Sequence, residues 1–112
     1  MSKIENTDAV IARLFDTIAS RKGGDVSASY TAKLFARGTD KIAQKLGEEA
    51  TETVIAALTG DTAELTAEAA DLLFHLLVLL GAKDVALADV LAELDRREGT
   101  SGLDEKAARI HK

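Results

Sequence analysis

The most constraining feature of this sequence is that its 112 residues contain no proline. Proline removes a backbone donor and clashes with the preceding helical turn, so its absence leaves long helical runs uninterrupted. The chain is also rich in Ala, Leu, Glu and Lys, whose side chains lose little conformational freedom in a helix. We therefore predict an all-α fold.

Composition is typical of an ordinary globular domain, with 46% hydrophobic and 29% charged residues. Aromatic residues make up only 4%, so aliphatic side chains must form the core. We expect one domain over residues 1–112, with 103–112 as a charged, partly helical tail. Because the chain has no cysteine, disulfides and zinc–thiolate sites are excluded, which fits a cytoplasmic location.

The net charge of −5 argues against nucleic acid as a partner, because such proteins carry basic surfaces. The most apolar run, 72–82, is shorter than the ~20 residues needed to cross a bilayer. We therefore expect no membrane association and interpret this run as part of a buried helix. The first residues contain no apolar stretch typical of a secretory signal.

Hydrophobic periodicity and helix-end signals predict a bundle of about five helices. In chain order, the predicted helices span 8–20, from Ser27 or Ser29 to Gly38, 39–59, 61–81, and from Asp84 to about 98. The helix at 61–81 is leucine-rich nearly all round and should be buried on most sides. Short helices offer it too few neighbours, so we expect a four-helix-bundle-like core that is completed by dimerisation.

The third predicted helix has acidic residues beside its packing face, which is formed by Ile42, Leu46, Ala50, Thr53 and Ala57. Glu49 falls about 50° from the centre of that face, so it is not simply a surface residue. Glu52 follows one turn later on the same flank, and Glu48 lies further round the helix.

The fourth predicted helix has a single polar stripe on an otherwise apolar surface. Its members follow one another at intervals of four, three and four residues, within about 60° of one another. They are Glu64, Glu68, Asp71 and His75. A Glu-x-x-Glu or Glu-x-x-Asp on one helix is usually a solvated face, but two acidic edges beside packing faces indicate that the helices bring them together.

Two carboxylates about 5 Å apart repel by roughly 3 kcal/mol at an effective dielectric constant of 20. Protonation could offset this repulsion by raising pKa values, and a divalent cation could offset it as well. Oxygen ligands with waters left over suit Mg²⁺ or Mn²⁺, and substrate phosphates commonly complete such a site.

Basic residues precede or overlap the first acidic motif, and each is either a solubilising charge or a phosphate ligand. They are Arg21, Lys22, Lys33, Arg37, Lys41 and Lys45. His75, alone on a buried helix, is more typical of a hydrogen-bonded core residue than of a metal ligand. A di-iron bundle is disfavoured, because Leu72 stands where that chemistry needs a Glu.

The acidic motifs resemble the signature of the all-α nucleoside triphosphate pyrophosphohydrolases: EEATE at 48–52, then fifteen residues, then EAAD at 68–71. Further segments resemble the phosphoribosyl-ATP pyrophosphohydrolase family within that group. These segments are SYTAKL at 29–34, KIAQKLGEE at 41–49, DLLFHLLVLL at 71–80 and SGLDEK at 101–106. The similarity extends over about 4–112, with mild departures at Thr51, Thr53 and Phe74.

The resemblance implies Mg²⁺-dependent hydrolysis of phosphoribosyl-ATP to phosphoribosyl-AMP and pyrophosphate, the second step of histidine biosynthesis, by a cytoplasmic homodimer. Carried over by motif, the Mg²⁺ ligands would be Glu49, Glu52, Glu68 and Asp71. Glu48 would orient or deprotonate the attacking water. Phosphates would be held by Arg37, Lys41 and Lys45, with Arg21, Lys33 and His75 as possible supporting residues.

Two alternatives remain at this point. One is a housecleaning enzyme of the same superfamily, which would share the metal site but act on ordinary or damaged nucleoside triphosphates. The other is a non-catalytic helical bundle whose acids bind a partner or a structural cation.

Overall fold

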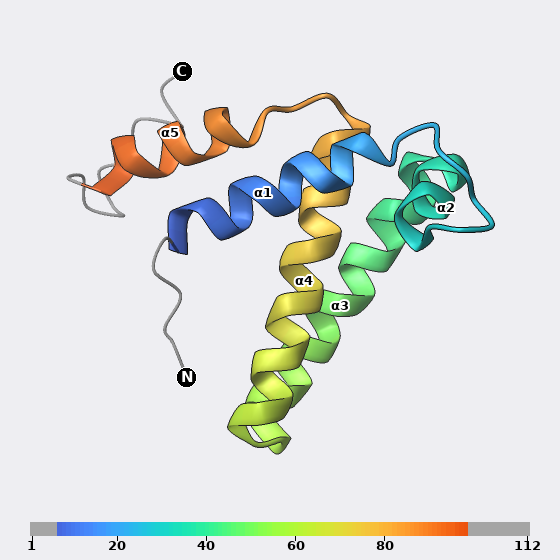
Figure 1. Ribbon diagram of the computed structural model, residues 1–112. Coiled ribbons are helices and arrows are strands. Elements are labelled where there is room, and N and C mark those ends of the chain that lie inside the picture. Colours follow the sequence, from blue (N-terminus) through green and yellow to red (C-terminus); the bar gives the residue numbers. More distant parts are fainter. Residues whose placement is uncertain (1–6, 99–112) are drawn as a thin grey trace.

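The structure, a computed structural model, describes residues 7–98, and these form five α-helices and no strands (Figure 1). The helices are α1 (Thr7–Ser20), α2 (Tyr30–Arg37), α3 (Thr39–Thr59), α4 (Thr62–Ala82) and α5 (Leu87–Glu98). The predicted all-α class is therefore confirmed. The tail expected at 103–112 lies outside the described residues.

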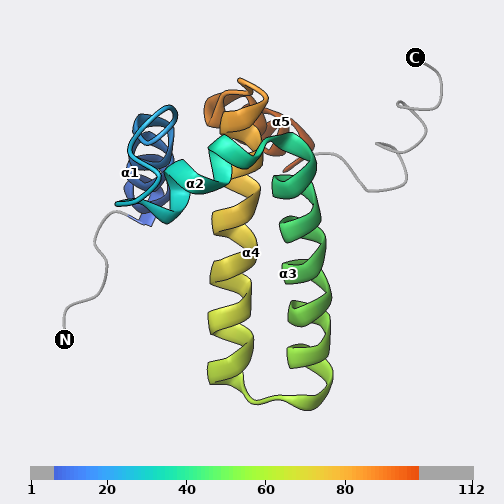
Figure 2. The same cartoon turned by 90° about the vertical axis from the view of Figure 1, so that its right-hand side faces the viewer.

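The two long helices, α3 and α4, form an antiparallel hairpin that is the main feature of the molecule (Figure 2). Gly60 and Asp61 connect them, and Asp61 is the N-cap of α4. Its Oδ1 accepts a hydrogen bond from the backbone N–H of Glu64 at 2.8 Å, which satisfies one of the free donors of the first turn. This two-residue connection fixes how the acidic edges of the two helices face each other.

The short helix α2 begins after Ser29 rather than Ser27. The Ser29 hydroxyl accepts a hydrogen bond from the N–H of Ala32, whereas the Ser27 hydroxyl donates to Asp25 Oδ1 at 2.7 Å. The helix ends at Gly38, as predicted, where φ is 94° and a side chain would be strained. The turn at Gly38 leads directly into α3, so α2 lies against the first turns of that helix.

The expected start of the fifth helix at Asp84 is wrong, because α5 begins at Leu87. Asp84 has a left-handed φ of 58° and belongs to the C-terminal turn of α4. There the N–H of Val85 bonds to the carbonyl of Leu80, and the N–H of Asp84 bonds to that of Gly81. These bonds form a Schellman motif, and the Asp84 carboxylate pairs with Lys22 instead of capping a helix.

The hydrophobic core lies at one end of the α3–α4 hairpin, where the other helices meet it. Its buried members come from all five helices: Ile18, Leu34, Ile42, Leu77, Val78 and Leu87. The far half of the hairpin extends away from α1, α2 and α5 (Figure 2). The predicted aliphatic core is therefore present, but it occupies only part of the long helices.

The expectation that the fourth helix is buried on most sides does not hold within residues 7–98. Four residues of α4 are buried, namely His75, Leu77, Val78 and Gly81, and Leu73 is 48% exposed. The helix packs on α3 along its length, but the shorter α1 and α2 contact it over only a few positions. Completion of the core by a second chain remains a prediction.

At 21 residues, α4 is long and apolar enough to cross a membrane by length and composition alone. Core helices of soluble proteins meet the same criterion. The predicted apolar run was shorter because the N-terminal half of the helix contains Glu64, Glu68 and Asp71. These acids and the packing against α3 identify α4 as one half of the hairpin.

The packing face of α3 differs slightly from the predicted one, since Ala56 is buried and Ala57 is exposed. The buried and half-buried positions 42, 46, 49, 53 and 56 alternate in steps of four and three. This is the spacing of a coiled-coil seam, in which two helices stay in contact by twisting around each other. Glu49 therefore occupies a core position of the hairpin and is 8% exposed.

Candidate active site

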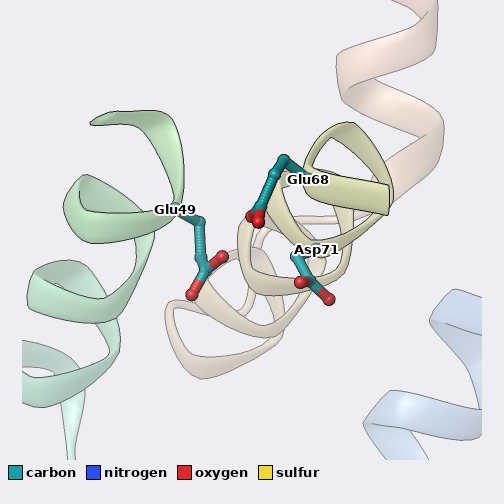
Figure 3. A group of neighbouring side chains, drawn as sticks. All are labelled: Glu49, Glu68 and Asp71. Atoms are coloured by element: carbon teal, nitrogen blue, oxygen red, sulfur yellow. The ribbon is translucent and has the colours of Figure 1, made fainter. Parts of the chain in front are cut away.

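Three carboxylates meet between α3 and α4 in the middle of the hairpin. Glu49 projects from α3 and Glu68 from α4 into the space between the helices, with Asp71 beside them (Figure 3). One oxygen from each of the three lies within 4.8 Å of the others. We call Glu49, Glu68 and Asp71 the three-acid group. The sequence prediction that the two acidic edges come together holds for these residues.

Within the three-acid group, Glu68 is the residue whose ionised form is disfavoured by its surroundings. Burial raises the pKa of its carboxyl, and the neighbouring charges of Glu52, Glu49 and Asp71 raise it further. Its Oε1 is buried and has no hydrogen-bond partner among residues 7–98. A buried acceptor without a partner destabilises the fold. A cation bound to the group would offset the repulsion between the carboxylates and give Oε1 of Glu68 a ligand partner. The donor set therefore fits a divalent metal ion.

Glu52, the fourth predicted metal ligand, lies at the edge of this arrangement. It is exposed and is not a member of the three-acid group. Its charge nevertheless raises the pKa of Glu68, so the two carboxylates are near neighbours.

A pocket of about 220 Å³ lies between α2 and the first half of α3. Its lining residues are Tyr30, Lys33, Leu34, Arg37, Lys41, Lys45 and Glu48. The structure thus brings the three predicted phosphate ligands together, with Lys33 beside them. Four cationic side chains around one cavity form a site suited to phosphate oxygens. We call this cavity the basic pocket.

Glu48 belongs to the basic pocket rather than to the three-acid group. Its Oε2 accepts a hydrogen bond from Gln44 Nε2 at 2.9 Å, and its Oε1 is 3.6 Å from Lys45 Nζ. The bond from Gln44, followed by the charges of Lys45 and Lys41, lowers the pKa of Glu48. The lowered pKa keeps this carboxylate in its ionised form, which can accept a hydrogen bond.

His75 is buried and hydrogen-bonded at both ring nitrogens. Its Nδ1 lies 2.8 Å from the carbonyl O of Asp71, which can only accept, so Nδ1 carries a proton. Its Nε2 lies 3.2 Å from the hydroxyl of Tyr30, which lines the basic pocket. This is the core-histidine arrangement favoured from the sequence, and it connects the pocket with the helix that bears Asp71.

Arg21 is not brought to this site. It lines a separate hollow with Gly24 and Ser29, between the end of α1 and the start of α2. Sequence reasoning, in turn, assigned no site role to Tyr30, Gln44 or Thr53. The intervals of four residues from Gln44 to Glu48 and from Glu49 to Thr53 are the signal that could have found the last two, because such side chains share a helix face.

Comparisons with known proteins show the family to which the chain belongs. Residues 11–98 match the family model described as phosphoribosyl-ATP pyrophosphohydrolase. The chain belongs to that family. Its curated relatives include a phosphoribosyl-ATP pyrophosphatase of Novosphingobium aromaticivorans, which is 70% identical over 100 residues, covering 89% of this chain and 94% of the relative.

Relatives of the same name confirm the resemblance. The protein of Dinoroseobacter shibae is 63% identical over 101 residues, 90% of this chain and 99% of the relative. That of Rhizorhabdus wittichii is 69% identical over 97 residues, 87% of this chain and 92% of the relative. The matched residues 11–98 include every residue of the three-acid group and of the basic pocket.

Proposed function

We propose that this chain hydrolyses phosphoribosyl-ATP to phosphoribosyl-AMP and pyrophosphate, the second step of L-histidine biosynthesis, and that it does so in the cytoplasm. The observation that carries the proposal is that the family match spans both the three-acid group and the basic pocket. An acidic group for a cation next to a basic cavity for phosphates is what cleavage of a phosphoanhydride needs.

Glu49, Glu68 and Asp71 would hold Mg²⁺, for which Mn²⁺ can substitute, with Glu52 as a fourth ligand at the edge. The buried, unpartnered Oε1 of Glu68 supports this assignment. When bound, the cation would neutralise negative charge on the phosphate oxygens and on the leaving pyrophosphate. Mg²⁺ usually keeps several ligands besides carboxylates, so these residues would hold the ion together with substrate phosphate and water.

Arg37, Lys41 and Lys45, with Lys33, would bind the substrate's phosphate oxygens in the basic pocket. Glu48, ionised at the rim of the same pocket, would accept a proton from water or orient it toward the α-phosphorus. The water oxygen would bond to the α-phosphorus as the bond from that phosphorus to the bridging oxygen breaks, which gives phosphoribosyl-AMP and pyrophosphate. Tyr30 and His75 support the pocket wall through their hydrogen bond.

We also propose that the protein acts as a homodimer. The outer face of α3 exposes Val54, Ile55 and Leu58, the last at 79%, and the opposite helix exposes Leu73. Large apolar side chains gathered on one element mark an association surface more often than an ordinary exterior. A second copy of the hairpin would supply the two further long helices that a four-helix bundle requires.

Substrate choice is tested by measuring pyrophosphate release from phosphoribosyl-ATP, ATP and dUTP in parallel with Mg²⁺ present. The proposal predicts release from phosphoribosyl-ATP and none comparable from the simple nucleotides. Release from ATP or dUTP instead would assign the protein to the housecleaning enzymes. If none of the three is cleaved, a non-catalytic cation-binding bundle becomes the better account.

A further inference from the structure

Thr53 lies on α3 one turn after Glu49 and is half-buried against α4. Its hydroxyl Oγ1 is 2.8 Å from the carbonyl O of Glu49 in its own helix and 3.2 Å from the carbonyl O of Glu68 in the opposite helix. One hydroxyl therefore joins the backbones of two residues whose carboxylates belong to the three-acid group.

Three other threonine hydroxyls in the described helices behave differently. Each of them donates to a carbonyl four residues earlier in its own helix, and the structure gives them no bond to a second helix. They are Thr51, Thr59 and Thr66. The Thr53 hydroxyl differs from these three by its second bond, which joins α3 to the Glu68 carbonyl of α4.

The intrahelical bond to Glu49 fixes the side-chain rotamer of Thr53, and this rotamer aims Oγ1 at α4. The hydroxyl proton is shared between the two carbonyls, and the Glu68 carbonyl has a second lone pair available besides the one used by its helix. A methyl group in place of the hydroxyl would stay about 3.3–3.6 Å from that oxygen, farther than the 3.2 Å observed. Replacement of the hydroxyl by a methyl group therefore both removes a bond and separates the backbones.

We infer that Thr53 is a positioning residue that sets the spacing of α3 and α4 at the three-acid group, and through it the affinity for a divalent cation. The inference rests on the cation site of the proposed function. Glu49 and Glu68 come from different helices, so their oxygens converge only if the helix backbones are held at one separation. Residues that orient metal ligands without touching the ion commonly change metal affinity by about 10–100-fold.

The test is a Mn²⁺ titration followed by electron paramagnetic resonance of the free ion, with circular dichroism to verify folding. Thr53→Val replaces the hydroxyl by a methyl group of similar size, and Thr53→Ala removes it without crowding. Both should weaken Mn²⁺ binding about tenfold or more. Thr53→Ser keeps the hydroxyl and should bind within about twofold of the native protein. Thr51→Val, which loses a bond of the same kind within α3 alone, should leave Mn²⁺ affinity unchanged.

Native Mn²⁺ affinity in Thr53→Val and Thr53→Ala would overturn this inference and leave the cation site intact. An equal loss in Thr51→Val would overturn it as well, because a change in α3 alone would then explain the effect. If Thr53→Val fails to fold, Thr53→Ala decides the question. A native protein that binds no Mn²⁺ would overturn the proposed cation site and this inference together.

Discussion

At the scale of single residues, the ionised carboxylate of Glu68 lowers the stability of the metal-free fold at a position suited to bind a cation. Its ionised form is disfavoured by burial and by three neighbouring carboxylates, so its pKa is raised in the folded protein. A raised pKa means that the protonated form stabilises the fold below the ordinary value of 4.5, and that this stabilisation is lost as the pH rises through the folded pKa. Above its raised pKa, Glu68 therefore places an unfavourable charge in the metal-free protein.

Glu68→Gln should consequently raise the melting temperature of the metal-free protein at pH 8 by a few degrees. The difference from the native protein should shrink as the pH falls through the raised pKa of Glu68, because the native carboxyl then becomes neutral. Thermal unfolding with a chelator present, over a series of pH values, measures both effects. A variant that melts below the native protein at pH 8 would show that the Glu68 carboxylate stabilises the metal-free fold.

In thermal unfolding with Mg²⁺ in place of the chelator, the ion should stabilise the native protein but not the Glu68→Gln variant. A ligand that binds only the folded state at 100 times its Kd adds about 2.7 kcal/mol of stability. Glu64→Gln is the matched control, because it removes one charge from the exposed first turn of α4, outside the three-acid group.

Some site residues were predictable from the sequence for a simple reason. Helical periodicity places Glu49 on the packing face and puts Glu68 and Asp71 on one stripe, and a two-residue connection makes the helices antiparallel. The direction in which each of the neighbouring glutamates turns was not predictable. Whether Glu48 or Glu52 turns toward the acids or toward the basic pocket depends on side-chain partners such as Gln44, which periodicity does not encode.

At the scale of helices, the contact of α2 with the C-terminal end of α4 depends on a glycine. A Cβ added at Gly81 would lie 3.1 Å from Phe35 Cζ, closer than ordinary van der Waals contact. Phe35 packs against the hydrophobic core, so its ring cannot move away freely. The buried glycine therefore lets α2 lie close to α4.

Gly81→Ala should lower the free energy of unfolding by about 1–2 kcal/mol, because overpacking outweighs the gain of about 1 kcal/mol in helix propensity. In a Phe35→Leu background, where the crowding is relieved, the same substitution should be neutral or stabilising. Urea unfolding of the four proteins in this cycle measures the coupling. Equal effects of Gly81→Ala in both backgrounds would show that contact with Phe35 is not the reason for glycine.

Helix boundaries were predictable where a cap has a strong local preference, as at Asp61 and Gly38. The start of α5 was not, because Asp84 is equally suited to cap a new helix or to adopt the left-handed turn that ends α4. Tertiary contact decides between these roles. The Nζ of Lys22 donates to the carbonyl of Gly81 and to Asp84 Oδ1, which holds the chain in the turn.

At the scale of the whole molecule, the hairpin is more exposed than its composition leads one to expect. The hydrophobic core occupies one end of the hairpin, and large apolar side chains are exposed on the outer face of α3. The sequence predicted a leucine-rich helix in need of neighbours, and residues 7–98 supply only part of them. One chain's periodicity tells which face is apolar but not what covers it.

Sedimentation velocity at micromolar concentration should therefore give a dimer. The double substitution Val54→Lys and Leu58→Lys should yield a folded monomer, because both side chains are exposed within one chain, at 58% and 79%. The control is Val26→Lys, which charges a 50% exposed residue in the connection between α1 and α2 and should remain dimeric. A native monomer would contradict the proposed assembly, and a dimer that survives the double substitution would exclude this face.

The central claim is that the three-acid group holds the divalent cation on which cleavage of phosphoribosyl-ATP depends. The most direct measurement is the rate of pyrophosphate release from this substrate, with Mg²⁺ or with a chelator, for the native protein, Glu68→Gln and Glu64→Gln. We expect Mg²⁺-dependent release, a loss of about a hundredfold or more in Glu68→Gln, and a near-native rate in Glu64→Gln. Release that persists with the chelator, or near-native release by Glu68→Gln, would contradict the account.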